Sequence, residues 1–139
     1  MPLAFYTENP YKSSAVHTVV ETPAYLASAR DEDLSGEERS MIVTYLARNP
    51  DTGDLMPGTG GARKVRFAGR GKGKSGGYRV VTFYAGSDIP VFLLDVYGKD
   101  TQANLSKAER NELRKVLTAL PQTWRDGAAR RKKMKESKP

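Results

Sequence analysis

The sequence predicts a small α+β domain in which helices pack on one face of an antiparallel sheet. A chain of 139 residues is long enough for one domain of moderate size. Three strand-like runs follow one another in its second half, and helix-start signals lie before and after them. Strands joined by short loops pair antiparallel, so we expect about four strands in the order β-α-α-β-β-β-α.

The first half of the chain predicts one strand and two helices. Residues 16–21 read VHTVVE and are rich in β-branched residues, which favour strands. Thr22 and Pro23 then supply a capping hydroxyl and a proline for the first helical position. The second helix begins at Ser35, where Ser-Gly-Glu-Glu matches a capping box. Its apolar stripe predicts a core face made of Met41, Ile42, Tyr45 and Leu46.

The second half predicts three strands, at about residues 62–68, 78–85 and 91–97. The third of these is the most apolar, and we therefore place it inside the sheet. A last helix begins at Ser106 with a second capping box, and we expect it to end before Pro121 because proline interrupts a helix.

The chain therefore divides into three parts. Residues 1–15 show no periodicity and predict an irregular arm, and residues 16–120 form the domain. Residues 121–139 are basic and poor in apolar side chains, so we expect a disordered tail.

Positive charge is concentrated in two segments. The whole chain has a net charge of +7, and residues 62–79 alone carry seven basic residues and no acidic one. Residues 121–139 add a charge of +5, which leaves the rest of the chain mildly acidic. A solvated surface usually mixes both signs, whereas such a concentration suits a polyanion, most often a nucleic acid.

Several function classes do not fit the composition. The chain has no cysteine and one histidine, and its carboxylates show no ligand-like spacing, so we expect neither a metal nor a cofactor. Gly73-Lys74-Ser75 does not complete a P-loop, because Ala68 stands where that motif needs glycine. No apolar run is long enough for a membrane span and no signal-peptide pattern opens the chain, so we expect a cytoplasmic protein.

Alternation along the strands predicts where the basic side chains lie. Lys64 and Arg66 share one face of their strand, and Arg79 lies near them if the next strand pairs in register. Lys99 follows the last strand and could close the same end of the sheet. These residues alone leave two possibilities open, a surface that binds a phosphate backbone or a solvated cationic face without catalysis.

Four segments resemble a known family. The runs ARKVRF, GKGKSGGYRVV, LLDVYGKD and NLSKAER are similar to RelE/HigB-type toxins of bacterial type II toxin–antitoxin systems, and most similar to the HigB-like branch. The resemblance spans about residues 16–120. It implies a RelE-like fold and a metal-independent endoribonuclease that cuts mRNA in the 30S A site of the ribosome. It also implies a cognate helix-turn-helix antitoxin that neutralises the toxin.

The resemblance also implies the site. Arg66 and Arg79 would stabilise the phosphate, and Lys64 and Lys99 would transfer protons. Asp100 stands where RelE-branch toxins carry an arginine. Residues 103–105 stand where those toxins carry a tyrosine. A catalytic scheme that uses those two groups therefore does not transfer to this chain, and Lys99 would do more of the work, with Tyr84 or Tyr97 as secondary candidates. Further RNA contacts are expected from Arg63, Arg70, Lys72, Lys74, Tyr84 and Tyr97.

Two other functions remain open from the sequence. A ParE-like toxin would share the architecture but act on DNA gyrase, and the density of lysine and arginine argues against it. A non-enzymatic nucleic-acid-binding module would use the loop and the basic tail to follow phosphates without cleaving RNA.

Overall fold

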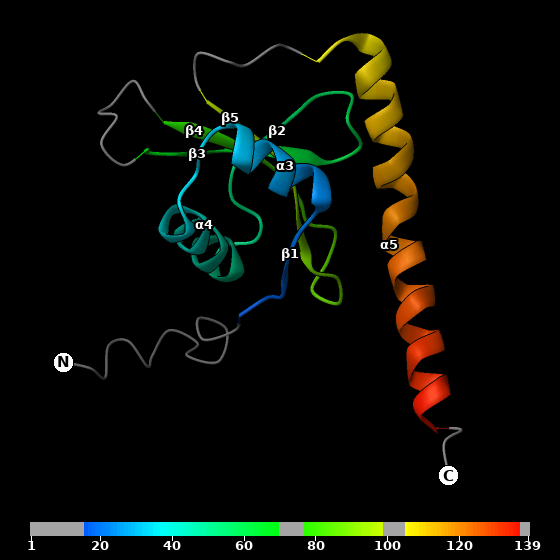
Figure 1. Cartoon of the computed structure of the whole chain (residues 1–139). Coiled ribbons are helices and arrows are strands. Elements are labelled where there is room, and N and C mark those ends of the chain that lie inside the picture. Colours follow the sequence, from blue (N-terminus) through cyan, green and yellow to red (C-terminus); the bar gives the residue numbers. More distant parts are fainter. Residues whose placement is uncertain (1–15, 70–76, 99–104, 137–139) are drawn as a thin grey trace, which may run out of the picture.

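The computed structural model describes residues 16–69, 77–98 and 105–136. Within them the chain forms a five-stranded sheet in the order β1-β5-β4-β3-β2 (Figure 1). The strands are β1 (Val19–Glu21), β2 (Asp54–Leu55), β3 (Ala62–Phe67), β4 (Tyr78–Phe83) and β5 (Val91–Gly98). The helices are α3 (Pro23–Asp31), α4 (Gly36–Arg48) and α5 (Lys107–Glu136). The α+β class and the order of the expected elements are confirmed.

The sheet is mixed, which corrects the expectation of a purely antiparallel one. Strands β2 to β5 pair antiparallel in sequence order, but β1 lies parallel to β5, with Val19 opposite Val91. The short strand β2 was also not expected. It pairs with β3 through only two residues, so it adds little pairing energy and leaves little trace in the sequence.

A first core lies between the sheet and the helices α3 and α4. Ile42 and Leu46 of α4 are 1% and 0% exposed and pack with Val80 and Leu93 of the sheet. The other half of the expected stripe on α4 does not belong to this core, because Met41 and Tyr45 are 49% and 44% exposed.

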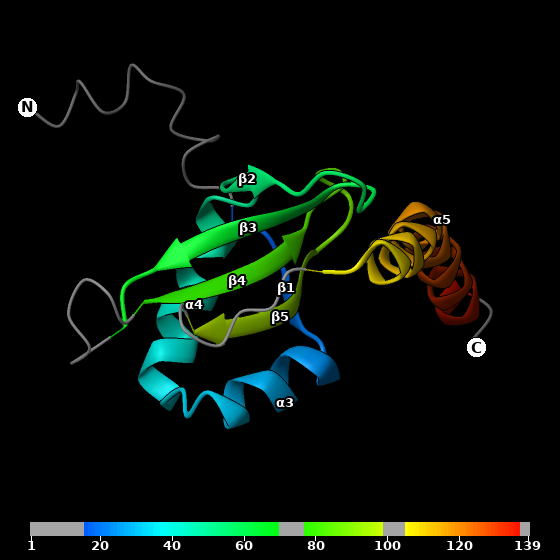
Figure 2. The ribbon, with the colours of Figure 1, turned by 90° about the horizontal axis from the view of Figure 1, so that it is seen from above.

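Helix α5 packs on the opposite face of the sheet, where we had expected no helix. A second core joins Leu117 of α5 to Val81, Phe83 and Phe92. The physical reason is visible in β5, whose run Val91–Leu94 is apolar on both faces and needs cover on both. Figure 2 shows α5 lying apart from α3 and α4.

The last helix also corrects the predicted boundary at Pro121. Helix α5 contains this proline and continues to Glu136, so most of the segment expected to be a disordered tail is helical. Proline inside a helix costs about 3 kcal/mol or more. Contacts beyond it offset this cost: Trp124 packs edge-on against Phe92 at 5.7 Å between ring centroids, and Arg125 binds Asp88 at 2.7 and 3.2 Å. No helix in the described part of the chain is long and apolar enough to cross a membrane.

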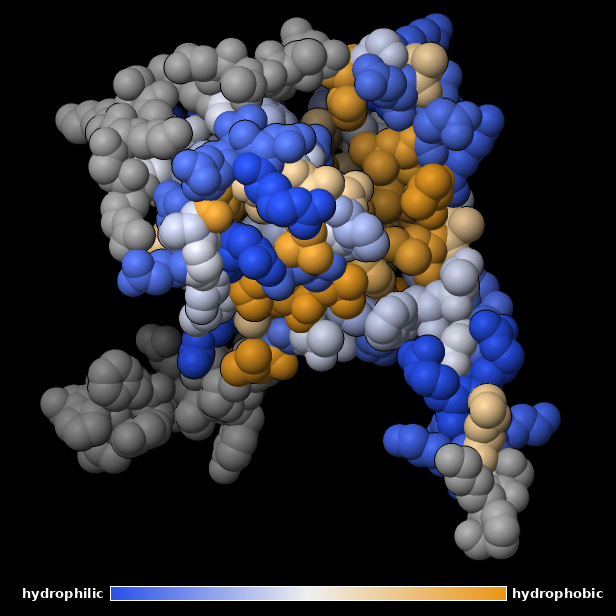
Figure 3. Space-filling view, viewed as in Figure 1, coloured by the Kyte–Doolittle hydropathy of each residue, from blue (hydrophilic) through white to orange (hydrophobic). Residues whose placement is uncertain are grey.

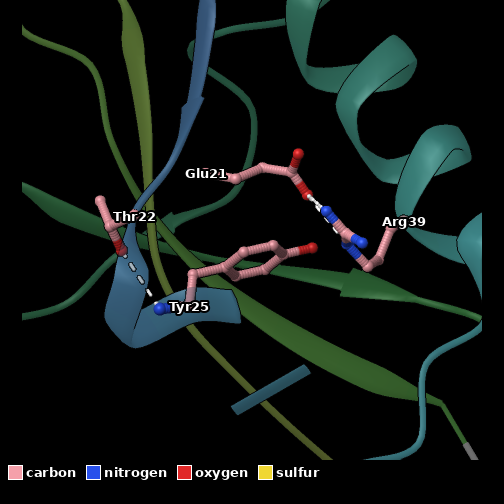
Figure 4. Close-up of polar contacts among 4 residues, drawn as sticks. All are labelled: Glu21, Thr22, Tyr25 and Arg39. Carbon is pink, nitrogen blue, oxygen red and sulfur yellow. Dashed lines mark hydrogen bonds and ion pairs between the residues drawn. The ribbon is translucent and has the colours of Figure 1, made fainter. Parts of the chain in front are cut away.

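Polar contacts hold the chain in place where β1 ends and α3 begins, beside the first core (Figure 4). The Thr22 hydroxyl accepts a hydrogen bond from the Tyr25 backbone N–H at 3.2 Å and donates one to the Leu93 carbonyl at 2.7 Å. Arg39 of α4 binds the Glu21 carboxylate at 2.9 and 3.1 Å. Burial, with a smaller effect of Glu21, raises the pKa of Tyr25 to about 12. These contacts hold β1, α3 and α4 together beside β5.

The capping box at the start of α4 provides a test of local stability. The Ser35 hydroxyl accepts from the Glu38 N–H at 3.0 Å, and Glu38 Oε1 accepts from the Ser35 N–H at 2.9 Å. We expect Ser35→Ala to lower the free energy of unfolding by about 1 kcal/mol, measured by urea denaturation. Ser40→Ala, an exposed change in the same helix, is the control and should not destabilise the protein. Equal losses in both variants would contradict the capping role.

Candidate active site

Two arginines and a tyrosine form a row across the middle of the sheet. Arg66 of β3 lies opposite Arg79 of β4, and Arg79 lies opposite Tyr97 of β5. Directly opposite residues share a face, with Cβ atoms about 4.5–5.5 Å apart. Lys64 lies two residues before Arg66 and therefore on the same face. We call Lys64, Arg66, Arg79 and Tyr97 the basic row, and in Figure 2 its three strands run side by side.

Two members of the basic row, Arg79 and Tyr97, carry donors without a hydrogen-bond partner among the described residues. Nη1 of Arg79 and Oη of Tyr97 are buried, and neither has a hydrogen-bond partner in the part of the chain that the structure describes. A buried polar group without a partner costs about 1–3 kcal/mol. An acceptor that reached both atoms would recover this free energy, and phosphate oxygens suit a guanidinium and a phenol at once.

The environment of Tyr97 keeps its phenol protonated. Burial raises the pKa of Tyr97, the positive charge of Arg79 acts in the opposite direction, and Asp95 raises it slightly further. Because the ordinary phenol pKa is already about 10, the group is neutral at physiological pH. Tyr97 can therefore donate a proton or a hydrogen bond in this row, but it is a poor base.

A cleft of about 640 Å³ borders the basic row. Lys64, Arg66 and Arg79 line it together with Phe67, which packs against the first core, and with the exposed Tyr45. The Tyr45 and Phe67 rings meet edge to face at 5.6 Å between centroids. Pockets of about 300–1,000 Å³ accept small organic ligands, so this cleft can hold a nucleotide-sized group. Its walls combine cations, which suit phosphate, with aromatic rings, which suit a base.

A second groove lies between α5 and the sheet. It measures about 850 Å³, and both Lys64 and Tyr97 border it. Apolar side chains gather where α5 meets the body of the molecule (Figure 3). Its apolar lining comes from Leu55, Met56, Val81, Leu94, Leu113 and Val116.

Two residues expected to contact RNA lie away from the basic row. Arg63 is on the opposite face of β3, where its Nη1 donates to the Gly53 carbonyl at 3.0 Å. Tyr84 follows the far end of β4 and meets the His17 ring edge-on at 5.4 Å. The structure does not bring either side chain to Arg79.

Four other predicted residues cannot be placed. Lys99, expected to transfer protons, lies outside the described residues, as do the RNA-contact candidates Arg70, Lys72 and Lys74. Lys99 follows directly after β5, whose last residue, Gly98, pairs with Tyr78 next to the basic row. Among the described residues, no group of three or more histidine or acidic side chains is arranged to hold a metal ion.

Comparison with known proteins gives the family. The model of the family described as the RelE toxin of the RelE/RelB toxin–antitoxin system matches residues 19–136. The chain belongs to the RelE toxin family. The match includes most of the segment after Pro121, which the resemblance in the sequence had left outside. A solved structure of the E. coli toxin RelE, a mutant in the free state, is 19% identical over 62% of this chain and 85% of that chain, with a TM-score of 0.44.

For this RelE-family toxin, the sequence predicted the cations of the basic row but not the exposed side chains of α4 that line the cleft. Met41 and Tyr45 were assigned to the core because they continue the apolar stripe of α4. Met41 and Tyr45 occupy one side of that stripe and Ile42 and Leu46 the other, and the local pattern does not show which side the sheet covers. Tyr97 was expected to contact RNA, but its place beside Arg79 depends on the β4–β5 register, which has an irregularity between Val81 and Thr82.

Proposed function

We propose that this RelE-family toxin is an endoribonuclease that cleaves mRNA on the translating ribosome and so inhibits translation. The observation that carries the proposal is the row of Arg66, Arg79 and Tyr97, with Lys64 beside it, on one face of the sheet. It is supported by membership in a family of toxins from toxin–antitoxin systems. Arg79 and Tyr97 each carry a buried donor without a partner among the described residues, and such donors next to further cations suit a phosphodiester better than a neutral substrate.

The proposed reaction uses the RNA's own 2′-hydroxyl as nucleophile. Its proton is removed, the oxygen attacks the adjacent phosphorus, and the P–O5′ bond breaks as the leaving oxygen takes up a proton. Arg66 and Arg79 stabilise the extra negative charge of the phosphorane. We assign proton transfer to Lys64 and Lys99. Tyr97 is added to the scheme as a donor to a phosphate oxygen or to the leaving group.

The identity of the cleavage products tests this chemistry. Purified toxin is added to an in vitro translation reaction, and the mRNA ends are mapped and their termini identified. Attack by the 2′-hydroxyl leaves a 2′,3′-cyclic phosphate and a 5′-hydroxyl, and a single 2′-deoxy nucleotide at the cleaved position should block it. Termini carrying a 3′-hydroxyl would contradict the mechanism. Uncut mRNA together with gyrase-linked DNA breaks would instead indicate a ParE-like toxin.

Tyr97→Phe separates a catalytic from a structural role of the phenol. Loss of a proton donor typically lowers a rate by about 10²–10⁴-fold, and we expect an effect at the lower end because the cations remain. The free energy of unfolding should stay the same or rise slightly, because the variant removes a buried hydroxyl without a partner. Single-turnover cleavage and urea denaturation measure the two quantities. An unchanged cleavage rate would remove Tyr97 from the mechanism.

The finer assignments are proposals as well. We propose a HigB-like toxin that works without a metal in the cytoplasm, in the 30S A site, paired with a helix-turn-helix antitoxin. The groove beside Lys64 and Tyr97 supports inhibition by an antitoxin, because an apolar segment bound there would cover two members of the basic row. A small helix-turn-helix protein encoded in the neighbouring reading frame, and its co-purification with this chain, would test the pairing.

A further inference from the structure

The last turns of α5 form a basic arm that extends beyond the sheet. The helix is fixed to the body as far as Arg125, through Leu117 and Trp124 in the second core and through the ion pair with Asp88. We call residues 128–136 the basic arm. Residues 129–136 are all exposed, and the helix projects away from the rest of the fold at this end (Figure 1).

The basic arm carries charge of nearly one sign. Its single acidic residue is Glu136, and its cations are Arg130, Arg131, Lys132, Lys133 and Lys135. The first part of the same helix is different, since it mixes signs and pairs Lys115 with Glu112 at 3.4 Å. Both parts belong to one continuous helix. The excess of positive charge in the arm is therefore a local feature and does not result from a basic composition along the whole of α5.

The cations surround the helix rather than forming one stripe. Residues 130–133 are consecutive, and at about 100° per residue they point in four different directions. Arg130 and Lys133, and Arg131 and Lys135, are neighbours along the helix surface and repel each other. Arg131 lies with its guanidinium carbon 5.4 Å from the Trp124 ring centroid, which ties the first turn of the arm to the body. Figure 3 shows mainly hydrophilic residues over this projecting end.

We propose that the basic arm is a second RNA-binding element that docks between phosphate backbones of structured ribosomal RNA. The proposal rests on the proposed function only for the identity of that RNA. A helix with cations on all sides is neutralised best by anions on more than one side, and folded RNA offers closely spaced phosphates there. An arm anchored by Trp124 and Arg125 would hold the toxin on the ribosome while the basic row acts on mRNA.

Two matched variants of the full chain test the arm. In the arm variant, Arg130, Lys132, Lys133 and Lys135 are changed to glutamine, and Arg131 is kept because it packs on Trp124. In the control, Lys107, Arg110, Arg114 and Lys115 of the first part of α5 are changed to glutamine. Both lose four positive charges from exposed positions of one helix. A third variant, R130K/K132R/K133R/K135R, keeps the charge of the arm.

Binding to vacant ribosomes is measured by fluorescence anisotropy over a range of salt concentrations. Each lost phosphate contact removes about 0.7–0.9 from the slope of log affinity against log salt, so the arm variant should lose about 3. The control and the charge-preserving variant should keep the wild-type slope. Wild-type binding by the arm variant, or equal losses in arm variant and control, would overturn the proposal.

The readout is independent of cleavage. At saturating toxin concentration the arm variant should still cut mRNA at the wild-type rate, because the basic row is unchanged. If the wild-type chain cuts no mRNA while the slopes differ as described, the nuclease proposal fails and the arm proposal stands. Circular dichroism of each variant checks that α5 remains helical.

Discussion

Replacing Arg79 with alanine is expected to lower the proposed ribosome-dependent cleavage of mRNA by about 10²–10³-fold, the usual loss when one preorganised donor to a developing anion is removed. Arg79 is at the centre of the basic row, opposite Arg66 on one side and Tyr97 on the other. Its Nη1 is buried without a partner among the described residues, so the side chain contributes little to folding. The rate is measured by single-turnover cleavage of mRNA on programmed ribosomes.

The controls for Arg79 separate charge from geometry and from folding. Arg79→Lys keeps the positive charge but loses the planar fork, and we expect an intermediate rate. Arg30→Ala removes an exposed arginine from α3, which packs on the other face of the sheet, and should leave the rate unchanged. A wild-type cleavage rate in Arg79→Ala would show that the row is a solvated cationic face rather than an active site.

Leu93→Ala is expected to lower the free energy of unfolding by about 2–5 kcal/mol, because it opens a cavity in a closely packed core. Leu93 is 0% exposed and belongs to the core under α3 and α4. Its carbonyl also accepts a hydrogen bond from the Thr22 hydroxyl at 2.7 Å, so the residue lies where β5 meets the start of α3. Urea denaturation gives the change as a lower midpoint at an unchanged slope.

The matched control is Leu55→Ala in β2. Leu55 is 61% exposed, and its truncation should change the free energy of unfolding by no more than about 0.5 kcal/mol. Equal losses at Leu93 and Leu55 would mean that the core does not lie between the sheet and α3–α4. Leu55 also lines the groove beside Lys64 and Tyr97, so the cleavage rate of Leu55→Ala tests whether this groove contributes to activity.

The sequence predicted the part of the candidate site that depends on residues two positions apart in the same strand. Lys64 and Arg66 share a face because side chains alternate along a strand, and this holds before any partner strand is known. The placement of Arg79 near them needed only one hairpin in register, which the structure has. Tyr97 required the register of a second pair, which contains an irregularity that local patterns do not reveal.

The exposed wall of the cleft, formed by Met41 and Tyr45, was not predicted from the sequence, and the reason is different. An apolar stripe on a helix shows which side of the helix faces the core. How many residues of the stripe are buried depends on how far the core extends beneath the helix. Ile42 and Leu46 are buried against the sheet, whereas Met41 and Tyr45 are exposed and line the cleft together with residues of β3. On that side of the sheet, β2 pairs with only two residues of β3.

The sequence by itself determined the α+β class, the starts of the helices and the strands around the basic segment. These depend on contacts within a few residues, such as the Ser35–Glu38 capping box. Only the tertiary structure decided the parallel pairing of β1, the second covered face of the sheet and the passage of α5 through Pro121. Those outcomes depend on partners far apart in the chain, as Thr22 and Leu93 or Arg125 and Asp88 are, and no local pattern encodes which distant partner wins.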